Sequence, residues 1–357
     1  MLLLWAGFIV IVVLMLLFDL CVLHRKSAVI SLKSALLWSV IWTLVAFVFN
    51  VGVYYIYKHD WMGITAQRLA AERSRIAATQ PSVAPPDNSA EAIAAADKRL
   101  ARLASAEYFA GYILERALSF DNLFVIAVIF TFFGIRPEHQ HRVLFWGIFG
   151  ALVLRGVMIL AAAWLVQTLT WMTYVFGALL ILTAIKMLRT KEESIEPEHN
   201  PLVRLARYVY PVTAEFHGPK FFVREAGRRA ITPLFLALIA VETTDLLFAV
   251  DSIPAIIGVT QDTFIVFTSN IMAILGLRAL YFALAGMMRE FEYLKLSLII
   301  ILAFVGVKML IAFRWHINIW WSLGIIMVIL AVGVVASIIA GKRQKGQTDD
   351  GAAGTPI

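Results

Sequence analysis

The sequence predicts an all-α polytopic membrane protein with about nine transmembrane helices and a 3+3 inverted repeat. Its 357 residues are 61% hydrophobic and 15% charged, whereas soluble domains carry about 25% charged residues. Mean hydropathy is +0.82. Charged side chains also recur in the same order in two apolar regions of the chain. The first two observations predict the membrane class, and the third predicts the repeat.

Nine apolar runs are long enough to cross a hydrocarbon core of ~30 Å. They lie at about 2–23, 34–57, 107–134, 142–166, 169–188, 231–254, 263–288, 294–313 and 318–340. The first run lacks a preceding basic segment, so we interpret it as a membrane span and not as a cleaved signal.

The distribution of Lys and Arg predicts the orientation. The loops 24–33, 135–141 and 189–230 are basic, as is the tail from 341, whereas 167–168 and 255–262 contain no Lys or Arg. Because basic loops stay in the cytosol, we expect the N-terminus outside and the C-terminus inside. We therefore attribute the net charge of +7 to membrane orientation and expect no nucleic-acid partner; the sequence does not identify a protein partner.

This reading divides the chain into seven segments. They are two N-terminal transmembrane helices (1–57), an external linker (58–106), repeat 1 (107–188), a basic cytosolic loop (189–230), repeat 2 (231–313), a final transmembrane helix (314–340) and a disordered cytosolic tail (341–357). Within the linker, residues 91–104 have the composition of a short amphipathic helix.

The two repeats carry matching charged positions. Glu115, Asp121 and Asn122 match Asp245, Asp251 and Ser252, while Arg155 matches Arg278 and Lys186 matches Lys308. Each unit holds three spans, an odd number, so the second must enter the membrane in the opposite sense. Such inverted repeats with polar groups at the midplane are typical of secondary transporters.

A charged side chain at membrane depth costs at least ~2.5–3.5 kcal/mol, which makes these residues candidates for function. We predict that Glu115, Asp121, Asn122, Glu242, Asp245 and Asp251 bind a metal cation. We predict that Arg155, Lys186, Arg278 and Lys308 pair with the acids or gate the site. Structural ion pairs are the alternative, particularly for Lys186 and Lys308 near span ends, where long side chains can snorkel.

The donor types restrict the cargo. Carboxylate, amide and hydroxyl oxygens suit Mg, Ca and Mn, whereas Zn and Cu favour His or Cys. The only cysteine is Cys21, in the first span. Pro254, three residues after Asp251, predicts that its span ends or kinks there and frees carbonyl oxygens near the acid.

Two segments carry a family resemblance. The stretches Glu115-Arg-Ala-Leu-Ser-Phe-Asp121-Asn122 and Glu242-Thr-Thr-Asp245-Leu-Leu-Phe-Ala-Val-Asp251-Ser-Ile-Pro254 resemble the signatures of the TerC/Alx family. The resemblance covers about 105–313. It implies a bacterial inner-membrane protein related to LysE-type transporters, and it implies manganese export and metal homeostasis.

We therefore expect a secondary transporter that exports divalent cations, with Mn²⁺ as the transported ion, the lipid bilayer as its surroundings and no permanently bound cofactor. Proton antiport is the expected coupling. The alternatives are a redox or stress-response modulator of the tellurium-resistance type without transport, and a transporter of Ca²⁺ or another solute. Enzymatic activity is not expected: an intramembrane aspartyl protease would need a Gly-x-Gly-Asp pattern, which is absent, and no nucleotide-binding loop occurs.

Overall fold

The computed structural model describes residues 2–23, 32–61, 90–169, 171–189, 200–213, 217–225, 228–284, 292–312, 314–315 and 317–352. Its helices are α1 (Leu2–Leu23), α2 (Leu32–Lys58), α4 (Ala90–Phe132), α5 (Pro137–Thr168), α6 (Met172–Arg189), α7 (Pro201–Val209), α8 (Pro233–Val259), α9 (Thr263–Leu275), α10 (Leu277–Leu284), α11 (Glu292–Ile311) and α12 (Ile319–Ala352). The strands β1 (Phe222–Glu225) and β2 (Arg228–Ile231) form an antiparallel hairpin. The predicted class, an all-α membrane protein, is confirmed.

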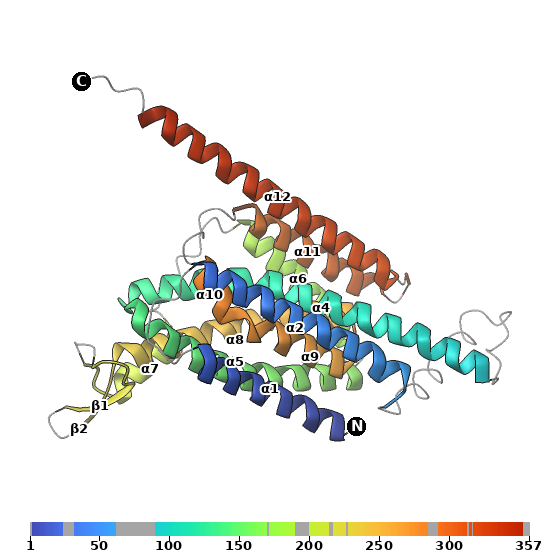
Figure 1. Ribbon diagram of the computed structural model, residues 1–357, viewed down its shortest axis with the longest axis horizontal. Coiled ribbons are helices and arrows are strands. Elements are labelled where there is room, and N and C mark those ends of the chain that lie inside the picture. Colours follow the sequence, from blue (N-terminus) through green and yellow to red (C-terminus); the bar gives the residue numbers. More distant parts are fainter. Residues whose placement is uncertain are drawn as a thin grey trace.

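The long helices lie alongside one another as a bundle (Figure 1). The start of α4 projects at one end of the bundle, the end at which α1 begins. The hairpin and α7 lie at the opposite end, as does the far end of α12 (Figure 1). The start of α4 and the basic segment around the hairpin therefore lie at opposite ends of the bundle. Which end is external stays a prediction, and residues 62–89 of the predicted linker lie outside the described part of the chain.

Among the described residues, six helical segments are long and apolar enough to cross a membrane. They are 33–58, 137–168, 172–189, 233–259, 263–283 and 319–337. The predicted spans 107–134 and 294–313 are covered by α4 and α11 but do not meet this criterion, and α1 contributes only a shorter apolar stretch, Leu3–Phe18. α4 carries Glu107, Glu115, Arg116 and Asp121 within its predicted span, so apolar composition alone does not select it.

The outer surface of the bundle is apolar. Val48 in α2, Val157 in α5 and Val328 in α12 are all more than 60% exposed. In contrast, nearly all of the segment 263–283, which includes α9, is buried. Large exposed apolar surfaces mark membrane contact, so the arrangement places α9 at the protein centre and α2 and α12 toward lipid.

Each helix of the segment 107–188 packs antiparallel to its counterpart in 231–313: α4 to α8, α5 to α9 and α6 to α11. In every pair, ascending residues of one helix meet descending residues of the other. The contacts are Glu107 with Thr260 and Gly111 with Ile256, Gly156 with Phe267 and Gln167 with Thr263, and Gly177 with Met309 and Ile181 with Gly306.

Three expectations about local structure differ from the observed helices, and the first is that the span ends at Pro254. α8 continues through Pro254 as one helix to Val259; neighbouring helices and side chains can compensate the hydrogen bond that proline removes. The tail predicted to be disordered is helical as far as Ala352, as a continuation of α12. Segment 91–104, predicted as a separate short helix, is the beginning of α4.

The break that the sequence placed near Pro254 lies instead at Gly276, between α9 and α10. Arg116 of α4 occupies this position: its guanidinium donates to the Ala273 carbonyl at 3.1 Å and to the Ser39 hydroxyl at 3.1 Å. A Cβ added at Gly276 would lie 2.6 Å from Arg116 Nη1. The glycine therefore leaves room for the cation that satisfies a carbonyl at the end of α9.

Candidate functional site

The centre of the bundle holds one arginine bound to two carboxylates from different helices. Arg155 of α5 donates through Nε to Asp245 Oδ2 at 2.9 Å and through Nη2 to Asp245 Oδ1 at 2.7 Å. Its Nη1 donates to Glu115 Oε1 of α4. Arg155 is 0% exposed and Glu115 is 1% exposed. Glu115 and Asp245 are acids that the sequence comparison predicts to be equivalent, and both pair with the same cation.

Neutral side chains complete this central cluster. Asn270 of α9 donates to Glu115 Oε2 at 3.0 Å, and Arg155 Nη1 lies 3.5 Å from the Ser252 hydroxyl. Both neutral residues are buried, and the Asn270 amide oxygen has no hydrogen-bond partner among the described residues. We define the central cluster as Glu115, Arg155, Asp245, Ser252 and Asn270. With both acids ionised it has one negative charge in excess.

A third carboxylate, Glu242, lies one helical turn before Asp245 on α8. Its Oε2 is buried and has no hydrogen-bond partner among the described residues. The nearby Asp245 carboxylate repels the Glu242 carboxylate electrostatically. The carboxylate lies directly over Gly150 of α5, and a Cβ added there would collide with Glu242 Oε1. Gly150 therefore provides the space that Glu242 occupies.

Gly150→Ala is expected to displace the Glu242 carboxylate while leaving the fold intact, because the clashing atoms end a flexible side chain. For the transport function proposed below, we expect the cation flux to fall at least as far as in Glu242→Gln, with little change in the unfolding temperature. Gly52→Ala is the control, since a Cβ there meets nothing within 4 Å. Full transport by Gly150→Ala would show that the position of Glu242 is unimportant.

The other predicted ligand residues lie outside the central cluster or outside what the structure describes. Asp251 accepts a hydrogen bond from the Thr183 hydroxyl of α6 at 2.7 Å. Asn122 is buried on α4. The side chain of Asp121 is outside the described part of the chain, so its prediction as a ligand stays a prediction.

The structure does not bring the remaining predicted cations to Arg155's acids. Lys186 is exposed near the end of α6. Lys308 of α11 interacts electrostatically with Glu107. Arg278 is buried at the start of α10, where it acts electrostatically on His141 of α5. The equivalents Arg155 and Arg278 therefore have different surroundings, since α5 is continuous where α9 and α10 are broken.

Four polar residues of the bundle interior were not singled out in the sequence as site residues: Glu107, Arg116, Thr183 and Asn270. Glu107 accepts a hydrogen bond from the Thr260 hydroxyl at 2.6 Å and lies two turns before Glu115 on α4. The signal was available for Arg116 and Asn270, because each is a polar residue within a predicted apolar span. Glu107 gave no comparable signal because it lies near the boundary of its predicted span. Thr183 gave none because a small hydroxyl side chain is common in membrane helices.

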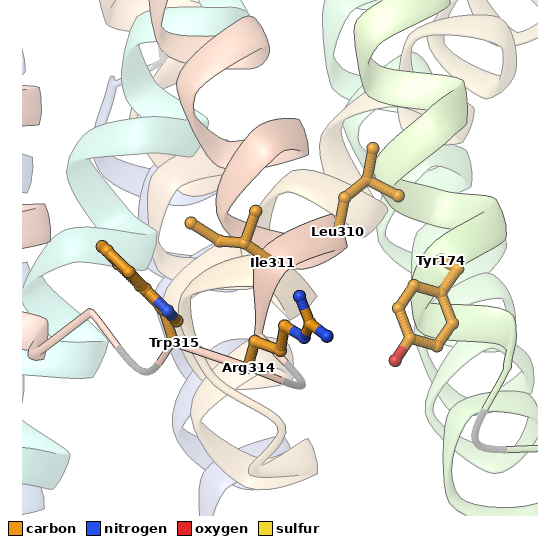
Figure 2. Close-up of a pocket in the computed structure, with 5 residues that line it drawn as sticks. All are labelled: Tyr174, Leu310, Ile311, Arg314 and Trp315. Carbon is orange, nitrogen blue, oxygen red and sulfur yellow. The ribbon is translucent and has the colours of Figure 1, made fainter.

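No group of three or more His, Cys, Asp or Glu side chains arranged to hold a metal occurs among the described residues. In this arrangement Arg155 occupies the oxygen atoms that a metal would need. The cavity in Figure 2, with a volume of about 570 Å³, lies elsewhere, between the ends of α6 and α11. Its described lining is Tyr174, Leu310, Ile311, Arg314 and Trp315 (Figure 2), and none of these residues offers a carboxylate to a cation.

The fold and the buried charges define a multi-pass helical membrane protein with a polar centre. The chain belongs to the family described as "Integral membrane protein TerC family", which it matches over residues 101–345. The resemblance carried by the two acidic segments is thereby confirmed.

The chain is also similar along most of its length to three bacterial proteins. It is 41% identical to "Uncharacterized membrane protein STKORF319" of Myxococcus xanthus over 97% of this chain and 95% of that one. It is 41% identical to "Putative membrane-bound redox modulator Alx" of Photorhabdus laumondii, covering 95% and 96% of the two chains. The protein of that same name in Escherichia coli K12 is 38% identical, with 97% of each chain covered. No solved structure matches the chain.

Proposed function

We propose that this protein is a secondary transporter that exports divalent metal cations, with Mn²⁺ as the foremost cargo. The observation that carries the proposal is the meeting of Glu115 and Asp245, equivalent acids of the two repeats, at the fully buried Arg155. Stability alone does not explain a buried ion pair well, because apolar residues in its place often give the same stability or more. Intramembrane acids mark ion pathways more often than they mark stability.

The proposed mechanism uses Arg155 as a built-in cation. In the described arrangement the guanidinium neutralises the two acids. When a divalent ion approaches, Arg155 releases at least one carboxylate, and the freed oxygens with Asn270, Ser252 and Glu242 become available to the ion. Hard oxygen donors of this kind suit Mn²⁺, Mg²⁺ and Ca²⁺. Displacement of Arg155 would then distinguish the loaded from the empty transporter.

The antiparallel packing of α4 on α8, α5 on α9 and α6 on α11 supports the proposed 3+3 inverted repeat. With it we propose nine spans, counting α1, α4 and α11, in a bacterial inner membrane. The external N-terminus and cytosolic C-terminus follow from the basic loops 24–33, 135–141 and 189–230. Inverted repeats that enclose a site at the midplane allow alternating access from the two sides.

Cellular manganese content tests the proposal. In bacteria without their own exporter, the native chain is expected to lower cellular Mn and raise Mn tolerance. Glu115→Gln, Asp245→Asn, Asp121→Ala and Asp251→Ala, at equal membrane abundance, are expected to lose this effect. Glu138→Gln is the control, because this carboxylate is half exposed at the start of α5. Unchanged Mn with the native chain would contradict the proposal, and loading cells with Ca²⁺ tests the alternative cargo.

Proton antiport is the proposed coupling, with Glu242 as the carboxyl that takes up the proton, since no cation among the described residues pairs with it and its Oε2 has no hydrogen-bond partner there. In vesicles, an imposed pH gradient is expected to accelerate Mn²⁺ flux through the native chain and not through Glu242→Gln. Flux that ignores the gradient would contradict antiport without affecting the export proposal.

A second function is that of a membrane-bound redox modulator without transport. It is favoured by the name given to the relatives in Photorhabdus laumondii and Escherichia coli. It predicts that the central-cluster variants leave Mn content unchanged and still restore the redox response of cells lacking the relative.

A further inference from the structure

Between α6 and α8 the chain forms a small basic unit made of α7 and the β1–β2 hairpin, which we call the basic unit (residues 200–213, 217–225 and 228–231). α7 is well delimited: the Asn200 side chain accepts hydrogen bonds from the backbone N–H of Leu202 at 3.0 Å and of Val203 at 3.3 Å. Pro201 stands at the first helical position. α7 packs against α8 and lies with the hairpin at one end of the bundle (Figure 1).

One side of α7 is covered by the protein and another is not. Val203 is fully buried, and Ala206 packs against the core. Leu202, Leu205 and Val209 recur at helical spacing but are 46%, 55% and 57% exposed. An amphipathic helix that is so apolar on an uncovered face needs an apolar surrounding.

Cations lie on the other exposed side of α7 and beside it. Arg204 and Arg207 are exposed on the same helix, about 100° or more around it from Leu202, Leu205 and Val209. The segment before the hairpin and the hairpin itself add further exposed cations: Lys220, Arg224, Arg228 and Arg229. Glu225 is the one acid among the described residues of the basic unit. The described residues of this surface therefore combine a hydrophobic stripe with six cations and one carboxylate.

From this surface we infer that α7 lies in the headgroup layer of the membrane leaflet at its end of the bundle and binds anionic phospholipid. Helices with Leu on one face and Arg on the other lie in the membrane interface with the apolar face in the acyl boundary. Clusters of cations next to a transmembrane helix are attracted to anionic headgroups. Pro233, the first residue of the membrane-spanning α8, follows β2 by two residues, so the basic unit is held at the membrane end.

The chemistry favours lipid over a protein partner of neutral or basic surface, because the apolar stripe and the cations occur together. The long arginine side chains can reach phosphates while their stems lie against acyl chains. By the orientation expected from the basic loops, the leaflet concerned is the cytosolic one, which carries the anionic lipid.

Spin-label depth measurements on the full chain test the inference. Cys21 is the only cysteine, so Cys21→Ser provides the background for Leu205→Cys, labelled with a nitroxide. Glu225→Cys, on the exposed hairpin, is the matched control. Each is reconstituted in nanodiscs of phosphatidylcholine alone or mixed with phosphatidylglycerol. Circular dichroism checks that each variant retains its helix content.

In phosphatidylglycerol discs we expect the label at 205 to collide more with oxygen than with a water-soluble nickel chelate, and the label at 225 to show the reverse. High salt, phosphatidylcholine alone, or Arg204→Gln with Arg207→Gln should shift the label at 205 toward water, because each weakens the attraction to anionic headgroups. Free inorganic phosphate at the same ionic strength should have no greater effect than chloride.

Three results would overturn the inference. The label at 205 could be as accessible to the nickel chelate as that at 225, which would place α7 in water. It could be shielded from both reagents, which would mean that protein covers it. It could lie at equal depth in both lipids with no effect of the arginine replacements, which would show that α7 does not bind anionic headgroups.

Discussion

Arg155→Ala is expected to lower the free energy of unfolding by about 3–5 kcal/mol, because it leaves Glu115 and Asp245 buried without their cation. Few single substitutions lower the free energy of unfolding by that much. Those that do have an identifiable cause, such as a buried charge left without a partner. The measurement is thermal unfolding of the purified protein in detergent, with abundance in the membrane as a second readout. Arg314→Ala is the control, since this exposed arginine (Figure 2) should change stability by no more than about 0.5 kcal/mol.

A triple replacement separates stability from function at the same site. Glu115→Gln, Arg155→Leu and Asp245→Asn together remove all three charges, and buried ion networks replaced by neutral groups often keep their stability. We expect the triple variant to unfold near the native temperature and to be inactive in the Mn assay. A triple variant that transports would show that the central cluster is only structural. If the Arg155→Ala protein were as stable as the native chain, Glu115 and Asp245 would not need Arg155 to neutralise them.

Gly306→Val is expected to have the second large effect, on the packing of α6 against α11. A Cβ at Gly306 would lie 2.8 Å from the Gly177 carbonyl oxygen and 2.9 Å from Ile181 Cγ1. Because the first of these is backbone, the helices themselves must separate, and overpacking of this kind typically costs about 1–3 kcal/mol. Small residues that allow such close approach are common between membrane helices. The check is again thermal unfolding in detergent.

Gly324→Ala supplies the contrast within the same chain. It lies exposed in α12, where an added Cβ meets nothing within 4 Å. Helical Gly→Ala in open space is expected to stabilise by roughly 0.5–1 kcal/mol. Equal loss of stability at 306 and 324 would contradict the close packing of α6 and α11.

The membrane class, the family and the three charged residues of the central cluster, Glu115, Arg155 and Asp245, were predicted from the sequence. Apolar runs of about twenty residues have few other stable uses, and charges inside them stand out against that background. The helix does not end at Pro254 as predicted. The hydrogen bond that proline removes can be read from the sequence, but whether the helix continues depends on the neighbouring helices and side chains. The break at Gly276 depends on Arg116, a residue 160 positions earlier, and no local pattern shows that relation.

The sequence by itself determined that two matching sets of acids and bases lie in apolar runs. Its spacing also predicts that Glu115 and Asp121 do not share a helix face, because six residues of helix rotate by about 240°. Which charges meet was decided only by the tertiary structure. Arg155 joins Glu115 and Asp245 across two helix interfaces, and Asn270 reaches Glu115 from a third. Residue spacing determines rotation within one helix, whereas contacts between helices depend on how their whole surfaces pack.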